Sequence, residues 1–505
     1  MLKTKGTQIV DSKGRAVILR GVNLGNWLVP EGYLFKFEGK FDRPHRIYAL
    51  TETLAGEQYS KNFWKEFRRS FITEADIKAI AGFGFNSVRI PFHYQFFISG
   101  EKEGFELLDA VIGWCKKYEI LVILDMHCAP GGQTGTNIDD DRNDKPELWQ
   151  NDGNKKLAIE VWRSIAKRYS KEGIVAGYDL LNEPLPAQFS AHNAELIPLY
   201  KEMISAIRSV DKKHIIFIEG AHWATEFSMF TEPLDGNMVY SFHKYWNETD
   251  KGSIEKFLQL SKSHNVPLWV GETGENANQW YFSCMQMLEE NGIGWCFWPW
   301  KKLETNNAPC AVEKPEGYDR IISYTKGEPV PSRDEAVKTL DELLVNIGFA
   351  KCTKNEDVIN SLLRKIPGTI EAEDFGGGGE GISYHDESDK NEGGAYRLNE
   401  GVDIQQNGLS VGWMSSGEWL LYDINCPASR LYNIEFRVAS PASGGVFRLE
   451  LDGKDITGPI NVINTGNWGN WAVFEKKGIS IPQGSHKVKL FVINGGFNLD
   501  WMKFK

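Results

Sequence analysis

Short apolar runs alternate with longer amphipathic segments over residues 1–300 of the chain. Runs rich in β-branched and aromatic residues occupy 16–22, 85–90, 120–125, 175–181, 214–219, 237–243, 266–271 and 294–298. Helix-like segments, such as 155–172 and 194–210, lie between most of them. Continuous apolar strands that alternate with helices are typical of a parallel sheet covered on its outer face. The eight units predict the α/β class and, within it, a (β/α)8 TIM barrel.

Polar and aromatic side chains follow these runs. They are Asn23, Asn26, Arg89, Asp125, His127, Asn182, Glu183, Glu219, His222, His243, Tyr245, Glu272 and Trp298. Ordinary strand ends carry Gly, Ser, Asp and Asn in no particular pattern, whereas this set is rich in carboxylate, imidazole, guanidinium and indole groups. Since the active site of such a barrel lies at the C-terminal ends of its strands, the set predicts a catalytic centre there.

Two glutamates stand out because of where they lie in the predicted barrel. Glu183 ends the fourth strand, in GYDLLNEP, and Glu272 ends the seventh, in WVGETGE. Strands four and seven face each other across the mouth of a barrel. Carboxylates about 5 Å apart suit retaining glycoside hydrolysis, and a gap of about 6.5 to 9.5 Å suits inversion. The sequence leaves both spacings open.

The pattern changes after the eighth run. Residues 301–365 read as helical, and residues 367–505 consist of short alternating runs, such as YNIEFRVAS and KVKLFVI, separated by Gly and Asn turns. Such runs predict a β-sandwich, or jelly roll. The expected domains are a barrel at 1–350, a helical connector at 351–366 and the sandwich at 367–505.

Composition narrows the range of partners. The chain has 17 Trp in 505 residues, and indole rings suit the flat, weakly polar faces of sugars. A net charge of -11 argues against nucleic acid or an anionic membrane as a partner. The 7 Cys form no CxxC pair, so neither a disulfide framework nor a zinc site is indicated, and most are expected in the core.

The N-terminal segment MLKTKGTQIVDSKGRAVILRGV alternates like strands around a turn and lacks the apolar core of a signal peptide. No apolar run approaches the length of a transmembrane helix, about 18 to 20 residues. The protein is therefore either intracellular or a secreted protein whose signal has been replaced by Met.

Seven motifs in order carry a family resemblance. RGVNLGNW, SVRIPF, ILDMH, LLNEP, HKY, WVGE and CFWPW resemble glycoside hydrolase family 5, over residues 17–300. The resemblance implies that Glu183 is the general acid/base and that Glu272 is the nucleophile, with no metal or other cofactor needed for catalysis. The implied substrate-binding residues of the barrel are Glu31, Arg89, His127, Asn182, His243, Tyr245 and Trp298.

The resemblance also gives each of these side chains a task. Asn182 would bind the sugar 2-hydroxyl, and Trp298 would form the floor on which the sugar stacks. Arg89 and Tyr245 would keep Glu272 ionised and oriented, as a nucleophile requires, and the two histidines would line the subsite beside the cleaved bond.

Two longer segments, RGVNLGNWLVPEGYLF and ILDMHCAPGGQTG, look most like exo-acting β-1,3-glucanases, which makes Glu31 a candidate sugar ligand. The chain departs from them at Cys128, where Gly is usual, and in the continuation TNIDDDRNDKPELW. The acidic run 139–141 in that continuation is expected to be a solvated loop, with calcium binding as the alternative.

The C-terminal motifs TIEAEDF, GGAYRLNEGVDI, VGWMSSGEWLLYDI, TGNWGNW and GGFNLDWMKF resemble a family 6 carbohydrate-binding module. The resemblance implies that Trp413 and Trp468 sandwich a sugar, with Asn498 as hydrogen-bonding partner. It also implies a structural Ca²⁺ held by Glu371, Glu373 and Asp500, whose hard oxygen ligands suit that ion. The alternative places both tryptophans in the core, where Trp419, Trp471 and Trp501 are expected.

These observations favour a retaining β-glycoside hydrolase that acts on a β-glucan, with β-1,3-glucan preferred. An endo-β-1,4-glucanase or a mannanase or xylanase of the same family remains an alternative. A metal-dependent hydrolase is disfavoured because the first strand ends without a His-x-His pair, and a non-catalytic carbohydrate-binding barrel is disfavoured because both glutamates are present. A polymeric substrate implies a secreted or periplasmic protein, and a monomer is expected.

Overall fold

The computed structural model describes residues 1–406 and 409–505, which form two compact units. Unit 1 comprises residues 1–246, 255–275 and 292–355. Unit 2 comprises residues 247–254, 276–291 and 356–505. Each unit is described by itself.

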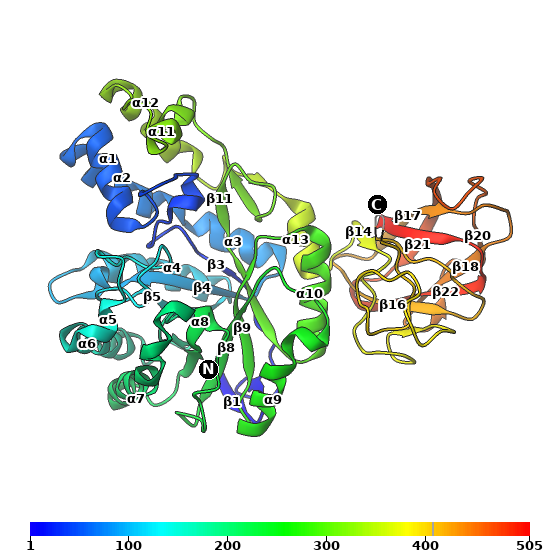
Figure 1. Ribbon diagram of the computed structural model, residues 1–505, viewed down its shortest axis with the longest axis horizontal. Helices are drawn as coiled ribbons and strands as arrows, with labels where there is room; N and C mark the ends of the chain where they lie inside the picture. Colours follow the sequence, from blue (N-terminus) through cyan, green and yellow to red (C-terminus); the bar gives the residue numbers. More distant parts are fainter. Residues whose placement is uncertain (407–408) are drawn as a thin grey trace. The chain divides into compact units, whose positions relative to one another are not determined.

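Parallel strands in unit 1 close into a barrel, in blue to green in Figure 1, with the order β10-β3-β4-β5-β6-β7-β8-β9. The strands are β3 (Arg20–Asn23), β4 (Ser87–His93), β5 (Leu121–Cys128), β6 (Val175–Asp179), β7 (Ile215–Glu219), β8 (Met238–Lys244), β9 (Leu268–Gly274) and β10 (Gly294–Trp298). Each overlaps one of the eight predicted runs. The predicted (β/α)8 barrel is therefore confirmed.

Burial on both faces explains why these strands read as continuous apolar runs. Every residue of β4, β6, β7, β8, β9 and β10 is buried. Inside the barrel, Phe217 and Trp269 meet with ring centroids 5.0 Å apart. A hairpin of β1 (Lys3–Lys5) and β2 (Gln8–Val10) precedes the barrel, and Leu2, just before β1, and Ile9, in β2, belong to the same apolar cluster. The barrel interior is thus a packed core, and open space for a ligand is left to its mouth.

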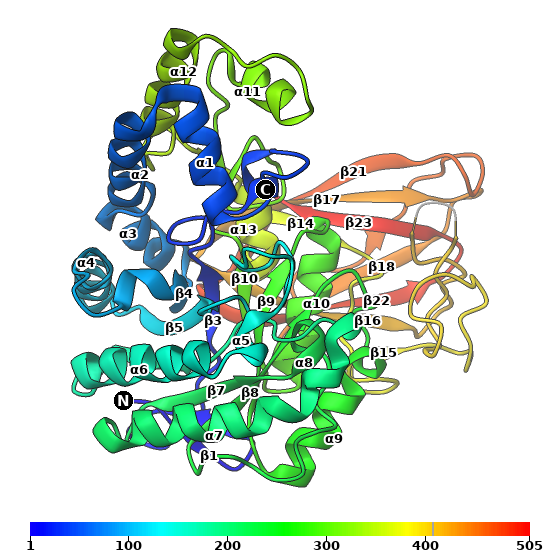
Figure 2. The same ribbon diagram turned by 60° about the vertical axis from the view of Figure 1, so that its left-hand side comes forward.

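Helices surround this barrel. Those of unit 1 are α1 (Pro44–Ala55), α2 (Glu57–Phe71), α3 (Glu74–Phe83), α4 (Glu103–Lys117), α5 (Glu147–Gln150), α6 (Asp152–Tyr169), α7 (Asn193–Val210), α8 (Ala221–Ala224), α9 (Glu255–His264), α11 (Tyr318–Thr325) and α12 (Arg333–Asn346). Although α12 is far from α1 and α2 in sequence, it lies beside both of them in the two views (Figures 1 and 2).

The segment predicted to be helical at 301–365 also contains strands. β11 (Lys301–Leu303), β12 (Cys310–Val312) and β13 (Thr353–Lys354) form a three-stranded sheet, which the prediction missed. Strands of two or three residues are too short to give a period-2 pattern.

Unit 2 is built around two antiparallel sheets, coloured yellow to red in Figure 1. One has the order β14-β23-β17-β21, and the other has the path β15-β16-β22-β18-β19, with β20 paired to β18. Their strands are β14 (Gly368–Glu371), β15 (Tyr384–His385), β16 (Trp419–Cys426), β17 (Arg430–Ala439), β18 (Val446–Leu451), β19 (Lys454–Asp455), β20 (Ile460–Asn461), β21 (Ala472–Ile481), β22 (Gly484–Asn494) and β23 (Asn498–Phe504). Unit 2 also contains α10 (Asn278–Glu290) and α13 (Glu356–Leu363).

The strands of the sandwich are buried on one face only, in contrast to the continuously buried strands of the barrel. In β16, β18 and the middle of β17, buried residues alternate with partly exposed ones. The buried set, which includes Tyr422, Phe436, Phe447 and Leu490, forms one apolar cluster. The predicted β-sandwich is confirmed.

Two further expectations concern cysteines and the membrane. All seven cysteines are free and buried, as expected for small core residues. Within residues 1–406 and 409–505, no helix combines the length and the apolar character needed to cross a membrane.

Candidate active site

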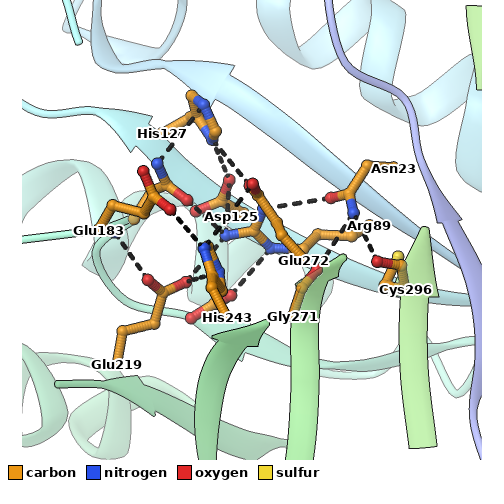
Figure 3. A network of polar contacts seen from close by, with 12 residues as sticks. Asn23, Arg89, Asp125, His127, Glu183, Glu219, His243, Gly271, Glu272 and Cys296 are labelled. Atoms are coloured by element: carbon orange, nitrogen blue, oxygen red, sulfur yellow. Dashed lines mark hydrogen bonds and ion pairs between the residues drawn. The ribbon is translucent and has the colours of Figure 1, made fainter. Parts of the chain in front are cut away.

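Most of the polar residues predicted at the strand ends converge at one end of the barrel, as Figure 3 shows for Asn23, Arg89, Asp125, His127, Glu183, Glu219, His243 and Glu272. Glu183 follows β6, Glu272 lies in β9, and His243 lies in β8 between them in the barrel order. One oxygen of each glutamate and one ring nitrogen of His243 lie within 4.8 Å of one another. The carboxylates that the sequence left at an undetermined distance are therefore at the short spacing, which suits retention.

Arg89 in β4 lies at the centre of the network in Figure 3 and is fully buried. Its guanidinium nitrogens lie 2.6 Å from Glu272, 2.9 Å from both Asp179 and Glu219, and 3.2 Å from Asp125. It also donates to the side-chain oxygens of Asn23 and Asn182, at 3.1 and 2.9 Å. A buried cation with this many anionic partners is held in one position, because any shift would leave a carboxylate unpaired.

Glu272 is held by two donors. Arg89 Nη1 donates to Oε1 at 2.6 Å, and the Tyr245 hydroxyl donates to Oε2 at 3.1 Å. Burial raises the pKa of the Glu272 carboxyl, and the charges of His243 and Arg89 oppose that rise. The neighbouring charge of Glu183 adds to the rise in the Glu272 pKa, because two like charges in one site repel each other.

His243 bridges the two glutamates and a third carboxylate. Its Nδ1 lies 2.7 Å from Glu183 and 3.7 Å from Glu272, while its Nε2 lies 3.3 Å from Glu219. Burial alone would lower the pKa of His243, but these three neighbours raise it well above its ordinary value. Carboxylates lie beside both ring nitrogens and orient the ring.

Glu219, at the end of β7, fixes the backbone of Glu183. Its Oε2 accepts a 2.6 Å hydrogen bond from the Glu183 amide, and Glu183 has a φ of 42°, in the sparsely populated left-handed region. Burial alone would raise the pKa of Glu219. The charges of His243 and Arg89, with the hydrogen bonds that Glu219 accepts, instead lower that pKa to about 2. The sequence placed Glu219 at a strand end but gave no sign of this supporting contact.

His127, Asn182 and Trp298 form one side of the site. The His127 and Trp298 rings stack at a centroid distance of 5.4 Å and an angle of 2°, and Asn182 Nδ2 lies 3.5 Å from His127 Nε2. Asp125 lies 2.8 Å from His127 Nδ1. Trp298 is only 3% exposed, so the surface that it offers to a sugar is small.

Glu31 lies beside this group as a buried acid. It is 4% exposed, and burial, with the nearby charges of Glu272 and Glu183, raises its pKa to about 8. Its Oε1 has no hydrogen-bond partner among the described residues. Since buried polar atoms are normally paired, this oxygen is available to a ligand.

The acidic run 139–141 does not form the expected solvated loop. Asp139 and Asp141 are fully buried. Asp139 accepts a 2.6 Å hydrogen bond from the Thr134 amide, Asp140 pairs with His45 and His93 at 2.6 and 3.1 Å, and Asp141 pairs with Arg43. The prediction was wrong because the partners that satisfy these carboxylates come from distant segments.

The module residues divide into exposed rings and a buried amide. Trp413 and Trp468 are 56% and 48% exposed, so the alternative that placed both in the core is wrong. Asn498 is buried, and its Nδ2 has no partner within the described part of the chain. Trp419, Trp471 and Trp501, expected to be buried, are half-buried instead.

The carboxylates implied to hold calcium lie in unit 2. Glu373 is buried with Oε2 unpartnered among the described residues, and burial, then Asp374, raises its pKa to about 10. Burial and Asp500 raise the pKa of Glu371 to about 7, while Asp500 pairs with Arg437. A bound hard cation would offset the repulsion between these neighbouring carboxylates and favour their ionised forms. Within residues 1–406 and 409–505, Glu183, His243 and Glu272 are the only group of three or more His, Cys, Asp or Glu residues whose possible metal-ligand atoms, one from each, all lie within 4.8 Å of one another.

Comparison with protein-family models assigns both parts of the chain. Residues 51–304 match the model for cellulase, glycosyl hydrolase family 5. Residues 372–505 match the model for the carbohydrate binding module, family 6.

Curated relatives match just under half of the chain. The chain is 34% identical to "Beta-xylosidase" of Phanerodontia chrysosporium, covering 48% of this chain and 52% of that protein. It is 27% identical to "Endoglucanase C" of Acetivibrio thermocellus, covering 48% and 88%. It is 31% identical to "Probable glucan 1,3-beta-glucosidase A" of Aspergillus fumigatus, covering 43% and 56%. The chain thus spans about half the length of the first and third of these relatives.

Proposed function

The chain belongs to glycosyl hydrolase family 5, and we propose that it is a retaining β-glycosidase that cleaves a β-glucan, preferably β-1,3-linked. The observation that carries this proposal is the approach of the Glu183 and Glu272 oxygens to within 4.8 Å. Retaining enzymes hold the two carboxyl groups about 5 Å apart, which leaves no room for water between the nucleophile and the sugar. The preference for β-1,3 linkages rests on the motifs around Glu31 and on the similarity to proteins named as glucan 1,3-beta-glucosidases.

In the first step, the Glu183 carboxyl gives its proton to the glycosidic oxygen while Glu272 attacks the anomeric carbon. The C–O bond to the leaving sugar breaks, and an ester to Glu272 forms. Glu272 is oriented for attack by its hydrogen bonds from Arg89 and Tyr245. These donors favour the negative charge on Glu272 and leave the proton of the pair to Glu183.

In the second step, water enters where the leaving sugar was. Glu183, now a carboxylate, takes a proton from the water as its oxygen attacks the anomeric carbon, and the ester to Glu272 breaks. His243 holds Glu183 through the 2.7 Å contact in both steps. Two displacements restore the β configuration.

The remaining barrel residues bind the sugar at the cleaved bond. Asn182 is suited to the 2-hydroxyl, where a hydrogen bond strengthens as the ring approaches the oxocarbenium geometry. Glu31 is a neutral acid below a pH of about 8 and can donate to a sugar hydroxyl as well as accept from one. His127 and Trp298 form one wall of the subsite. Because little of Trp298 is exposed, a sugar would contact the edge of its indole ring more than the full face.

The module is proposed to hold the polysaccharide, with a glucan ring between Trp413 and Trp468 and a hydroxyl on Asn498. Glu371, Glu373 and Asp500 would hold the structural Ca²⁺, which supplies positive charge that offsets repulsion among the carboxylates. This calcium predicts a higher unfolding temperature with added Ca²⁺ than in excess chelator, measured on the whole chain. An unchanged temperature would remove the calcium proposal. Secretion or a periplasmic location follows from the polymeric substrate.

Trapping the covalent intermediate tests the proposed function. In a 2-deoxy-2-fluoro-β-glucosyl fluoride, the fluorine at C2 destabilises the positively charged transition states of both steps. The fluoride leaving group keeps the first step fast, so the ester to the enzyme forms readily and is released slowly. Mass spectrometry of the digested protein is expected to find the sugar on the peptide that contains Glu272. A label on another residue, or rapid turnover of the true substrate with no label at all, would refute the assignment.

A second candidate is a β-1,4-glucan-cleaving enzyme of the same family, favoured by the similarity to a protein named endoglucanase C. Product analysis on β-1,3-, β-1,4-, β-1,6- and mixed-linkage glucans, mannan and xylan distinguishes the two. Rapid release of glucose from β-1,3-glucan supports the first candidate. Cleavage of internal β-1,4 bonds supports the second.

A further inference from the structure

Gln133 lies on the loop that follows β5 and is 0% exposed. Its side-chain Nε2 donates to two backbone carbonyl oxygens, that of His127 at 2.7 Å and that of Asn182 at 2.9 Å. Its Oε1 accepts from the Ala129 amide at 3.1 Å. A glutamine amide has two N–H donors and one acceptor oxygen, so each of these groups has a partner. The hydrolysis described above gives this side chain no task.

Gln133 holds the chain on both sides of Glu183. Before Glu183, the Asn182 carbonyl accepts from the Gln133 side chain. After it, the Leu185 amide donates to the Gln133 carbonyl at 3.4 Å, and that carbonyl also accepts from Trp149 Nε1 at 2.9 Å. Glu183 and Leu185 have φ values of 42° and 54°, which residues with a Cβ adopt only where the surrounding structure imposes them. The contacts with Gln133 help to impose this backbone.

The peptide bond between Asn182 and Glu183 is anchored at both of its polar groups. Its carbonyl oxygen accepts from Gln133, and its N–H donates to Glu219 at 2.6 Å (Figure 3). A peptide unit is planar, and in the trans form its C=O and N–H point to opposite sides. Anchors on both sides prevent the plane from rotating, and this fixes the direction in which the Glu183 side chain leaves the backbone.

The loop that carries Gln133 is itself held in place. Gly132 has a φ of 75°, and a Cβ there would lie 2.5 Å from the Cβ of Asp141, so only glycine fits. On the other side of Gln133, the Thr134 amide donates to Asp139 at 2.6 Å. The buried acidic run therefore packs against the turn that presents the Gln133 amide.

We propose that Gln133 is a positioning residue for proton transfer, because it holds the Asn182–Glu183 peptide and so aims the Glu183 carboxyl at the glycosidic oxygen. The inference rests on the proposed function. In the first step Glu183 gives its proton to the departing oxygen, and in the second it takes one from water. Since Gln133 acts through the backbone of the general acid, its loss should weaken both transfers while Arg89 and Tyr245 still hold the nucleophile.

A leaving group that needs no proton separates this role from a structural one. 2,4-Dinitrophenol leaves as its anion, whereas a sugar must be protonated as it leaves. In Gln133→Met the side chain has a similar length and no donors. We expect kcat/KM to fall by about a hundredfold on a β-1,3-gluco-oligosaccharide and by less than about threefold on 2,4-dinitrophenyl β-glucoside. Both substrates are measured on one preparation, so the folded fraction cancels in their ratio.

The second step gives an independent readout. Release of the ester needs Glu183 as a base, so kcat on the dinitrophenyl glucoside should fall in Gln133→Met although kcat/KM does not. Azide attacks without a base, and it should restore this kcat and give the β-glucosyl azide. Gln133→Glu keeps the shape of the side chain but replaces the donor nitrogen by oxygen, and it should show the same pattern.

Tyr178→Phe, in β6, is the matched control. It removes a buried 2.8 Å hydrogen bond to Asp211 and should keep the wild-type ratio of the two substrates. Equal losses on both substrates in the Gln133 variants, wild-type rates in them, or a ratio that Tyr178→Phe lowers as much, would overturn the inference and leave the glycosidase proposal intact. A wild-type protein that cleaves neither substrate would overturn the proposed function itself and the inference with it.

Discussion

The barrel site buries its charged side chains, whereas the candidate module site exposes its aromatic side chains. At the barrel mouth, charged groups are removed from water: Arg89 is 0% exposed and Glu272 is 4% exposed. In the module, large apolar rings remain in water, with Trp413 56% exposed and Trp468 48% exposed. Charges in a dry, fixed network interact strongly and need no reorganisation during reaction. Exposed rings gain their burial only when a sugar covers them, which suits adhesion.

This difference determines what a substitution costs. In the barrel, removing one member of the network leaves partners buried without compensation, so stability and activity fall together. In the module, an exposed ring makes few contacts in the free protein, so its loss affects binding and little else. The predictions below use this distinction, from the largest expected effect to the smallest.

The largest effect is expected for the two glutamates. Glu272→Ala should lower the rate of hydrolysis by about four orders of magnitude or more, because the variant has no carboxylate that can attack the anomeric carbon and form the ester. Azide should restore turnover and give the α-glycosyl azide in this variant, but the β-glycosyl azide in Glu183→Ala. Glu328→Ala, an exposed glutamate of the same unit, is the control. Turnover of Glu272→Ala within tenfold of the wild type would exclude Glu272 as nucleophile.

Arg89 should be the most costly residue of the network for stability. Arg89→Met leaves Asp179, Glu219 and Glu272 without their shared cation, and we expect a loss of about 3 to 5 kcal/mol in the free energy of unfolding. Urea denaturation measures it. Arg320→Met, which breaks an exposed pair with Glu335, should leave the free energy of unfolding nearly unchanged. Similar losses in the two variants would contradict the view that burial makes the difference.

Glu31 gives the barrel site a pH signature. Its folded pKa of about 8 lies above the ordinary value of 4.5, so the folded state keeps a proton that the unfolded state has released. The wild type should therefore lose stability as pH rises from 4.5 to about 8, by up to ~1.4 kcal/mol per pH unit. Glu31→Gln mimics the protonated acid and should gain on the wild type over that window. A difference between the two proteins that is constant from pH 5 to 8 would show that Glu31 titrates normally.

The smallest effect is expected in the module. Trp468→Ala should weaken retention on insoluble glucan by about tenfold and change the free energy of unfolding by less than about 0.5 kcal/mol. Turnover of a soluble oligosaccharide should stay at the wild-type level. Val473→Ala, also exposed in unit 2, is the matched control. If Trp468→Ala unfolded at clearly lower temperature or lost turnover on the soluble substrate, the separation of adhesion from catalysis would fail.

The barrel and the two glutamates could be predicted because their signal is local. A continuous apolar run that ends in Asn182-Glu183-Pro184 identifies a buried strand and its terminal carboxylate together. The sandwich likewise follows from period-2 alternation within single strands, such as Trp419–Cys426.

What could not be predicted depends on contacts between distant segments. Asp141 has the charge pattern of a solvated loop, but Arg43 reaches it from 98 positions away and makes its burial possible. The support of the Glu183 amide by Glu219 depends on a backbone angle that no residue type specifies. Periodicity alone did not place Trp413 and Trp468 at the surface, and the family resemblance supplied that expectation, which their exposure of 56% and 48% fits.

The configuration of the first product is the most direct test of the central claim, that Glu183 and Glu272 act in turn on one anomeric carbon. Proton NMR during the first minutes of hydrolysis, before the anomers equilibrate, reports that configuration. We predict that the β anomer forms first and the α anomer grows in later by mutarotation. If the α anomer is formed first, a single displacement by water has occurred, and Glu272 is not the nucleophile.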